Sequence, residues 1–285
     1  MLLRRVRSFV GRNLVKAGML QPRGIAAPAA PRAAGVGPVV LPEFGDMSAA
    51  PRKGRVVRDG YARGWGIQHG GLDETIRWDP VFRSAMAATR PYSLLDDVKL
   101  MNLYLLVRFY LPRLQHGHIV EFGSYRGGSA MFMALLAKHY LPGVRVWGLD
   151  TFEGMPATDH DLDAHRGGSL SETSLEAAQA AAAKLGLDNL TFVKGLFQDT
   201  ADAVLAEAGT VALAHIDCDI ADAVLYSWQR VKPVMVPGGY VIFDDATDSS
   251  CIGATEVVEE TVVRQDGLNS EQIWPHFVFR YPPVA

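Results

Sequence analysis

Short apolar runs and amphipathic segments alternate along the chain from residue 94 onward, and this alternation is the strongest constraint on the fold. The runs that predict strands are residues 118–123, 144–150, 189–195, 211–217 and 238–245. The segments between them have helical patterns and comprise residues 126–140, 174–186, 199–209 and 220–235. Strict alternation predicts a parallel sheet with right-handed crossovers. Because the strand runs are continuously apolar, we expect helices to cover both faces.

The flanking segments extend this pattern. Residues 94–109 carry a helical stripe that leads up to Pro112, and another helix is predicted from about Gly253 to Val263. The aromatic C-terminal segment WPHFVFRYP predicts an edge strand that prolines end. Residues 61–92 place aromatic side chains among glycines and charges, and we expect loops there, either as a lid or as a cover for the core.

Together these patterns predict an α/β fold, a Rossmann-like doubly wound and mostly parallel sheet with an N-terminal helical arm. We predict three parts: a basic helix and an Ala/Pro/Gly-rich arm (1–60), a helical or lid region (61–115) and the Rossmann-like domain (116–285). Three roles for the first helix stay open. It packs on the body or on a second subunit, it contacts a membrane surface peripherally, or it is an organelle-targeting peptide.

Charge is distributed unevenly. The net charge is -3, but residues 1–42 contain seven basic and no acidic residues, which leaves 21 basic and 31 acidic residues in the remainder. An acidic body repels phosphate backbones, so we expect no nucleic-acid partner. No run approaches the roughly 18 apolar residues that span a bilayer. Only two cysteines are present, which favours a reducing, cytoplasmic location.

Polar or glycine residues follow every predicted strand, at the edge where open parallel sheets bind ligands. The first strand runs into a glycine-rich turn, whose candidate cofactor contacts are Glu121, Gly123, Ser124, Gly127, Gly128 and Ser129. An acid at the position of Glu121 would repel a pyrophosphate, yet it suits the ammonium of a methionine moiety. Asp150 ends the second strand, where it can accept hydrogen bonds from ribose hydroxyls. The two features together favour an adenosyl ligand.

Three carboxylates follow the fourth and fifth predicted strands. Asp217 follows one, and Asp244 and Asp245 follow the other. If the two strands are neighbours, these carboxylates repel each other unless a cation neutralises them. Oxygen ligands favour Mg²⁺, Ca²⁺ or Mn²⁺ over Zn²⁺. The alternative is that they are helix caps or salt-bridge partners. For Asp219 and Asp222, which lie at the start of a predicted helix, we predict helix capping or an interaction with the helix dipole.

Five segments in this order resemble the macrocin O-methyltransferase family: EFGSYRGGSAMFMA, LDTFEGMP, VKGLFQDT, HIDCDI and PGGYVIFDDA. The resemblance covers about residues 90–265. It implies a class I methyltransferase fold, S-adenosylmethionine and Mg²⁺ as cofactors, and a homo-oligomer. It also implies metal ligation by Asp217, Asp244 and Asp245, ribose binding by Asp150, and adenine contacts near Phe197 and Gln198. Family members usually carry an aromatic residue in the stretch that reads DCDIAD here, so the identity of the acceptor is in doubt.

The predicted function is therefore metal-assisted O-methylation of a hydroxyl on a sugar or glycosylated small molecule. Asp217 or His165 is the candidate proton acceptor, and His160 lies in the same loop as His165. His215 should point away from Asp217, which favours a packing role for it. The alternatives are a cephalosporin hydroxylase-like enzyme, a catechol-type methyltransferase, and a binding homologue without catalysis.

Overall fold

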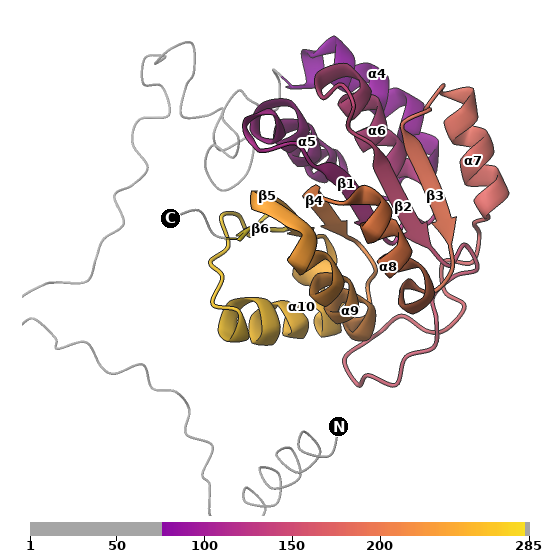
Figure 1. Ribbon diagram of the computed structural model, residues 1–285. Helices are drawn as coiled ribbons and strands as arrows, with labels where there is room; N and C mark the ends of the chain where they lie inside the picture. Colours follow the sequence, from indigo (N-terminus) through magenta and orange to yellow (C-terminus); the bar gives the residue numbers. More distant parts are fainter. Residues whose placement is uncertain (1–75, 283–285) are drawn as a thin grey trace, which may run out of the picture. The chain divides into compact units, whose positions relative to one another are not determined.

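The computed structural model describes residues 76–282, which form a six-stranded sheet in the order β3-β2-β1-β4-β5-β6 (Figure 1). All neighbouring strands are parallel except β5 and β6, which are antiparallel. The predicted mostly parallel, doubly wound sheet is thereby confirmed. The predicted basic helix and arm (1–60) lie outside the described residues, so the proposed division of the chain at residues 60 and 115 stays a prediction.

The strands are β1 (His118–Phe122), β2 (Val146–Asp150), β3 (Leu190–Lys194), β4 (Val211–Ile216), β5 (Met235–Phe243) and β6 (Phe277–Tyr281). The α-helices are α4 (Pro80–Thr89), α5 (Asp97–Leu105), α6 (Gly128–Tyr140), α7 (Leu175–Lys184), α8 (Phe197–Ala208), α9 (Ala221–Val231) and α10 (Ile252–Val257). Shorter 3₁₀ turns are η1 (Arg90–Tyr92), η3 (Leu111–Arg113), η4 (Lys232–Val234) and η5 (Asp245–Thr247). Two π-helical segments, η2 (Leu106–Tyr110) and η6 (Val258–Gln265), continue α5 and α10.

Two apolar cores lie on opposite faces of the sheet. Helices α4, α5, α6 and α7 cover one face, where alternate strand residues such as Ile119 and Leu213 are buried. Helices α8, α9 and α10 cover the other face, where Val120 and Ala214 are buried. Successive strand side chains point to opposite faces, so an almost continuously apolar strand serves both cores.

Strand register brings the ends of the central strands to one line. Phe122 of β1 pairs with Ile216 of β4, and Ile216 pairs with Phe243 of β5. The residues just beyond these strands therefore emerge side by side at the carboxyl edge of the sheet. This alignment places Gly123, Asp217 and Asp244 next to one another.

Residues 80–89 correct one expectation. They form helix α4 where the sequence predicted loops. Asp79 caps this helix by accepting hydrogen bonds from the amides of Val81 and Phe82, and Pro80 occupies the first turn, where no amide donor is needed. The Phe82 side chain is fully buried between the rings of Tyr104 and Phe132. The aromatic residue that suggested a loop is a core anchor.

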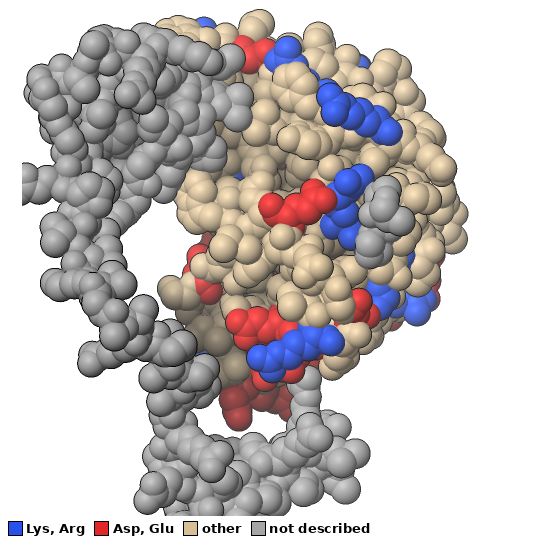
Figure 2. Space-filling model, turned by 90° about the vertical axis from the view of Figure 1, so that its left-hand side faces the viewer, with Lys and Arg blue, Asp and Glu red and all other residues tan. Residues whose placement is uncertain are grey.

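Two further sequence expectations concern a helix end and the surface. Gly186 follows α7 with φ of +66°, and the amide of Leu187 donates to the carbonyl of Ala182, so the helix predicted over residues 174–186 ends in a glycine cap. On the part of the described surface that Figure 2 shows, acidic and basic side chains form small separate groups and no continuous basic surface. Within residues 76–282, no helix is long and apolar enough to cross a membrane.

The burial of α4 leads to a stability prediction. Phe82→Ala should lower the free energy of unfolding by about 3–5 kcal/mol, because it leaves a cavity between two aromatic rings. Trp78→Ala is the matched control: its side chain is 74% exposed, and its removal should change stability by no more than about 0.5 kcal/mol. Urea denaturation of both variants measures the difference. Equal losses would contradict the assignment of Phe82 to the core.

Candidate functional site

A cavity of about 770 Å³ lies at the carboxyl ends of the strands. It extends from the residues that follow β3 to those that precede β6. The sequence-predicted site residues that line it are Gly123, Ser124, Gly128, Ser129, Asp150, Phe197, Gln198, Asp217, Asp244 and Asp245. Three predicted residues do not line it: Glu121, Gly127 and His165. The structure thus brings most of the predicted cofactor residues and all of the predicted metal ligands to one cavity.

The turn after β1 depends on the absence of a side chain at Gly123. Its φ of +90° is unfavourable for other residues, and a Cβ there would lie 1.8 Å from the carbonyl oxygen of Asp217. Gly127 has a φ of +82° and forms the N-cap of α6. The chain therefore turns sharply off β1 and starts a helix with its N-terminus at the cavity, an arrangement that suits a ligand close to the backbone.

Asp150 holds this turn in place. One carboxylate oxygen accepts hydrogen bonds from the amides of Ser124 and Tyr125, at 2.9 and 2.8 Å, and the other accepts from the amide of Phe152 at 2.7 Å. Burial raises the pKa of Asp150, although these three amides act in the opposite direction. A carboxylate oxygen can accept more than one hydrogen bond, so Asp150 can still receive a ligand hydroxyl.

Glu121 lies in the protein interior and not at the cavity wall. It is fully buried, and its carboxylate accepts hydrogen bonds from the Ser124 hydroxyl at 2.8 Å and from Nδ1 of His215 at 2.9 Å. Glu121 therefore does not line the cavity that the candidate cofactor residues share. Its visible role is to anchor the glycine turn and to hold His215.

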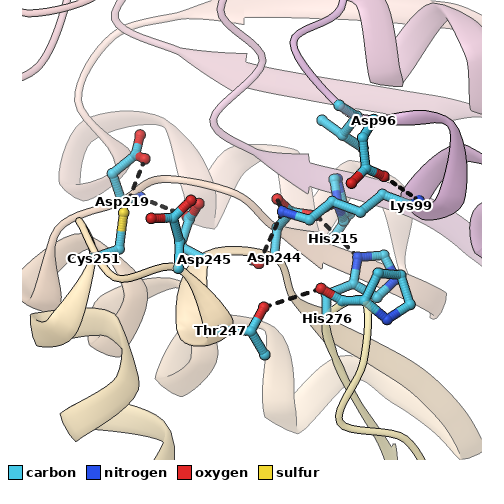
Figure 3. Close-up of polar contacts among 12 residues, drawn as sticks. Asp96, Lys99, His215, Asp219, Asp244, Asp245, Thr247, Cys251 and His276 are labelled. Atoms are coloured by element: carbon cyan, nitrogen blue, oxygen red, sulfur yellow. Dashed lines mark hydrogen bonds and ion pairs between the residues drawn. The ribbon is translucent and has the colours of Figure 1, made fainter. Parts of the chain in front are cut away.

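The carboxylate of Asp244 is surrounded by three basic side chains (Figure 3). Its Oδ1 accepts from Nδ1 of His276 at 3.0 Å and lies 3.4 Å from Nε2 of His215, while its Oδ2 accepts from the Lys99 ammonium at 2.5 Å. Burial alone would raise the pKa of Asp244, but the hydrogen bonds from His215 and His276 hold it well below its ordinary value. This carboxylate is therefore ionised.

The two histidines have different protonation states. His215 faces a carboxylate at each ring nitrogen, and these contacts raise its pKa well above the ordinary value despite burial, so it carries two N–H groups. His276 donates from Nδ1 to Asp244, while its Nε2 lies 2.7 Å from the amide nitrogen of Asn102, which is a donor. Burial lowers the pKa of His276, consistent with a neutral ring. The packing role that the sequence favoured for His215 leaves out its contacts with Glu121 and Asp244.

Within residues 76–282, no Lys, Arg or His side chain forms an ion pair with Asp217 or Asp245. One ligand atom each from Asp217, Asp244 and Asp245 lies within 4.8 Å of the others. Burial and the neighbouring carboxylates raise the pKa of both Asp217 and Asp245 well above the ordinary value. Among the described residues, the Lys99 ammonium forms an ion pair with Asp244 alone. Burial acts to lower the pKa of Lys99, but the Asp244 carboxylate raises it. The group has excess negative charge and is poised to bind a cation or a proton.

Asp219 lies beside this group, with a different set of partners. Its backbone amide donates to Oδ2 of Asp245 at 2.8 Å, and its carboxylate lies 3.5 Å from Nε2 of His165 and 3.4 Å from Sγ of Cys251. The sequence predicted that Asp219 caps α9, but the amide of Ala221, at the start of that helix, donates to Asp163 instead. His160 pairs with Glu256.

Sequence analysis missed the partners of Asp244. Lys99 lies on α5, 145 residues away in the chain, and His276 lies just before β6, 32 residues away. The sequence around them indicates only weakly that they are buried. Lys99 interrupts an apolar helical stripe, and His276 lies in an apolar aromatic segment. Neither signal identifies the partner, because the contact depends on how distant segments pack.

Comparison with known proteins gives consistent results. The sequence pattern of the Macrocin-O-methyltransferase (TylF) family matches residues 85–268. The 8-demethyl-8-(2,3-dimethoxy-alpha-L-rhamnosyl)-tetracenomycin-C 4'-O-methyltransferase of Streptomyces olivaceus is 34% identical over 163 residues, which are 54% of this chain and 62% of that protein. The mycinamicin III 3''-O-methyltransferase of Micromonospora griseorubida is 30% identical, over 57% of this chain and 68% of that protein. The match thus spans less than two thirds of the first relative.

Solved structures agree on the fold. The O-methyltransferase NovP has a TM-score of 0.59 and 23% sequence identity, covering 73% of this chain and 94% of its own. This likeness confirms a methyltransferase-type Rossmann-like architecture.

The turn after β1 provides a test of the site's architecture. Gly123→Ala should cost roughly 3–5 kcal/mol of unfolding free energy, because the new methyl group collides with the carbonyl of Asp217. Gly186→Ala is the matched control, since its φ is also positive but nothing lies within 4 Å of the added carbon, and it should cost about 1–2 kcal/mol. Thermal and urea unfolding compare the two. Similar losses would show that backbone conformation, and not the contact with Asp217, sets the cost.

Proposed function

Because the chain belongs to the macrocin O-methyltransferase family, we propose that it transfers the methyl group of S-adenosylmethionine to a hydroxyl of a sugar or glycosylated small molecule. The observation that carries this proposal is a single cavity with two chemically different walls. The glycine turn and Asp150 form one wall, and the carboxylates of Asp217, Asp244 and Asp245 form the other. A donor and a hydroxyl acceptor can meet between them.

For the donor, we propose the wall formed by the ends of β1, β2 and β3. Asp150 accepts from the ribose hydroxyls, and Phe197 and Gln198, at the start of α8, contact the adenine ring. Gly123 lines the cavity, and the absence of its side chain lets the Asp217 carbonyl pack against the turn. Methyl transfer is an in-line displacement, so a fixed donor orientation supplies much of the acceleration.

For a divalent metal ion, the donor set fits. Asp217, Asp244 and Asp245 offer only oxygen atoms, which Mg²⁺ prefers, and these atoms are close enough to converge on one ion. Asp244 keeps an acceptor position on Oδ2, because Lys99 occupies only one. When bound, the ion would lower the pKa of a coordinated hydroxyl. The raised pKa values of Asp217 and Asp245 indicate the electrostatic strain that such a cation would relieve.

The acceptor proton needs a base outside the metal ligands. Asp219 lines the cavity, and burial raises its pKa, which makes its carboxylate a better proton acceptor. His165 lies next to Asp219, with its Nε2 atom 3.5 Å from Asp219 Oδ1. We propose that Asp219 takes the proton and that His165 stabilises or receives it. Asp217, a predicted base, is better suited to hold the metal because it faces two other carboxylates.

The acceptor class rests on the relatives, whose names describe methylation of rhamnosyl-tetracenomycin and of mycinamicin. A neutral glycoside suits an acidic cavity wall, because it brings no negative charge. A catechol acceptor is the second candidate, which an assay on both compound classes distinguishes. The predicted homo-oligomer, cytoplasmic location and peripheral membrane contact stay predictions.

Two substitutions separate the two walls. Asp217→Ala should retain S-adenosylmethionine binding but lose Mg²⁺ binding, and its methyl transfer should fall on the order of a hundredfold or more. Asp150→Ala should lose donor binding, because it removes the ribose acceptor and releases the glycine turn. Isothermal titration calorimetry measures both ligands. Asp188→Asn, which removes an exposed carboxylate paired with Lys138, is the control and should behave as wild type.

Either of two results would overturn this proposal. Absence of donor binding by the wild-type protein, with and without Mg²⁺, would exclude a methyltransferase. Unchanged Mg²⁺ binding by Asp217→Ala would show that the carboxylates do not form the metal site.

A further inference from the structure

Asp219 and Cys251 lie on the far side of Asp245 from Asp244 (Figure 3). Together with a third residue they form a group of three side chains of different chemistry. They are His165 from the loop after β2, Asp219 from the loop after β4, and Cys251 from the start of α10. One ligand atom of each, a ring nitrogen, a carboxylate oxygen and a thiol sulfur, lies within 4.8 Å of the others. We refer to these residues as the mixed trio.

The separations in the mixed trio match a tetrahedral metal site. Zinc bonds of about 2.0–2.3 Å place neighbouring ligand atoms of a tetrahedron roughly 3.3–3.8 Å apart. The Asp219 Oδ1 atom lies 3.5 Å from His165 Nε2 and 3.4 Å from Cys251 Sγ. Two of the three distances between ligand atoms therefore already match a tetrahedral site. Only the distance between His165 Nε2 and Cys251 Sγ would need to adjust.

Contacts from the surrounding chain hold the three ligands in place. Asp163, two residues before His165, pairs with Cys251 in an isolated β-bridge, and its carboxylate accepts from the amide of Ala221 at 3.1 Å. The Asp219 amide donates to Oδ2 of Asp245 at 2.8 Å. The loop, the turn and the helix are thus tied together independently of the ligand side chains, which lowers the ordering cost of metal binding.

We propose that His165, Asp219 and Cys251 form a site for a soft divalent cation such as Zn²⁺, with its fourth position open to the cavity that Asp219 lines. Thiolate and imidazole ligands favour Zn²⁺, whereas the oxygen-only group of Asp217, Asp244 and Asp245 favours Mg²⁺. On binding, the Cys251 S–H bond breaks, its electron pair forms the bond to the metal, and the proton leaves to water. The two neighbouring sites would thus select different metals by donor chemistry.

The positive charge of a bound metal ion would favour the thiolate form of Cys251. Burial and the carboxylates of Asp245 and Asp219 raise the pKa of Cys251, so the free protein holds a thiol. A bound dication reverses this balance, because a coordinating thiol is deprotonated outright. The metal therefore binds with release of one proton from this residue.

One consequence rests on the proposed function. If Asp219 accepts the acceptor proton, a metal on its carboxylate removes that base. Zn²⁺ should then inhibit methyl transfer while Mg²⁺ supports it.

The primary test is Co²⁺ titration of the full chain after removal of metals with EDTA and desalting. Co²⁺ replaces Zn²⁺ spectroscopically, and thiolate ligation gives a near-ultraviolet charge-transfer band. We expect this band to saturate at one equivalent and to disappear when Zn²⁺ is added. Cys251→Ser should abolish it, and His165→Asn should weaken Co²⁺ binding about tenfold or more.

Matched controls use the other thiol and the other loop histidine. Cys218→Ser and His160→Asn should keep the band, because neither residue belongs to the mixed trio. Circular dichroism and thermal unfolding confirm that each variant folds. Absence of the band in the wild-type protein would overturn the proposal, and so would its persistence in Cys251→Ser.

Asp217→Ala separates this proposal from the proposed function. The variant should lose Mg²⁺ binding and keep the Co²⁺ band, so failure of donor or Mg²⁺ binding would leave the mixed trio unaffected. In the activity assay, Zn²⁺ should inhibit the wild type at lower concentration than Cys251→Ser. If Zn²⁺ inhibited the wild type and Cys251→Ser equally, the mixed trio would not be the inhibitory site. The inhibition would then be assigned to Zn²⁺ at Asp217, Asp244 and Asp245.

Discussion

The buried carboxylate of Asp244 is the contact on which the site most depends. It joins β5 to α5 through Lys99, to β4 through His215, and to the segment before β6 through His276. A charge in the interior is costly unless every partner is present, so these segments must dock together for any one of them to be stable. The contacts of Asp244 that hold these segments together are therefore also contacts of the candidate site.

Much of the fold and part of the site could be predicted because their signals are local. Apolar runs identify strands, and the residues just beyond the strands of a parallel sheet must lie at one edge of it. This reasoning found Asp150 and the group of Asp217, Asp244 and Asp245. It could not find Lys99, whose contact spans 145 residues. It also misjudged Glu121, because the same residue type suits either a ligand or a buried histidine.

Electrostatics gives the cavity a preference for cations. Nine aspartates and one lysine line it within the described residues, and that lysine is already paired with Asp244. A sulfonium donor and a divalent ion both reduce this excess negative charge, whereas an anionic ligand adds to it. Burial, together with neighbouring carboxylates, raises the pKa of Asp217, Asp219 and Asp245.

The loop after β2 contacts the N-terminus of α9, a helix that lies much later in the chain. Ile220, at the N-cap of α9, has no side chain that can accept a hydrogen bond, and Asp163 supplies the missing acceptor to Ala221. If this loop swung outward, the helix would lose its cap, at a cost of about 1–2 kcal/mol. The start of α9 and the loop after β2 therefore stabilise each other.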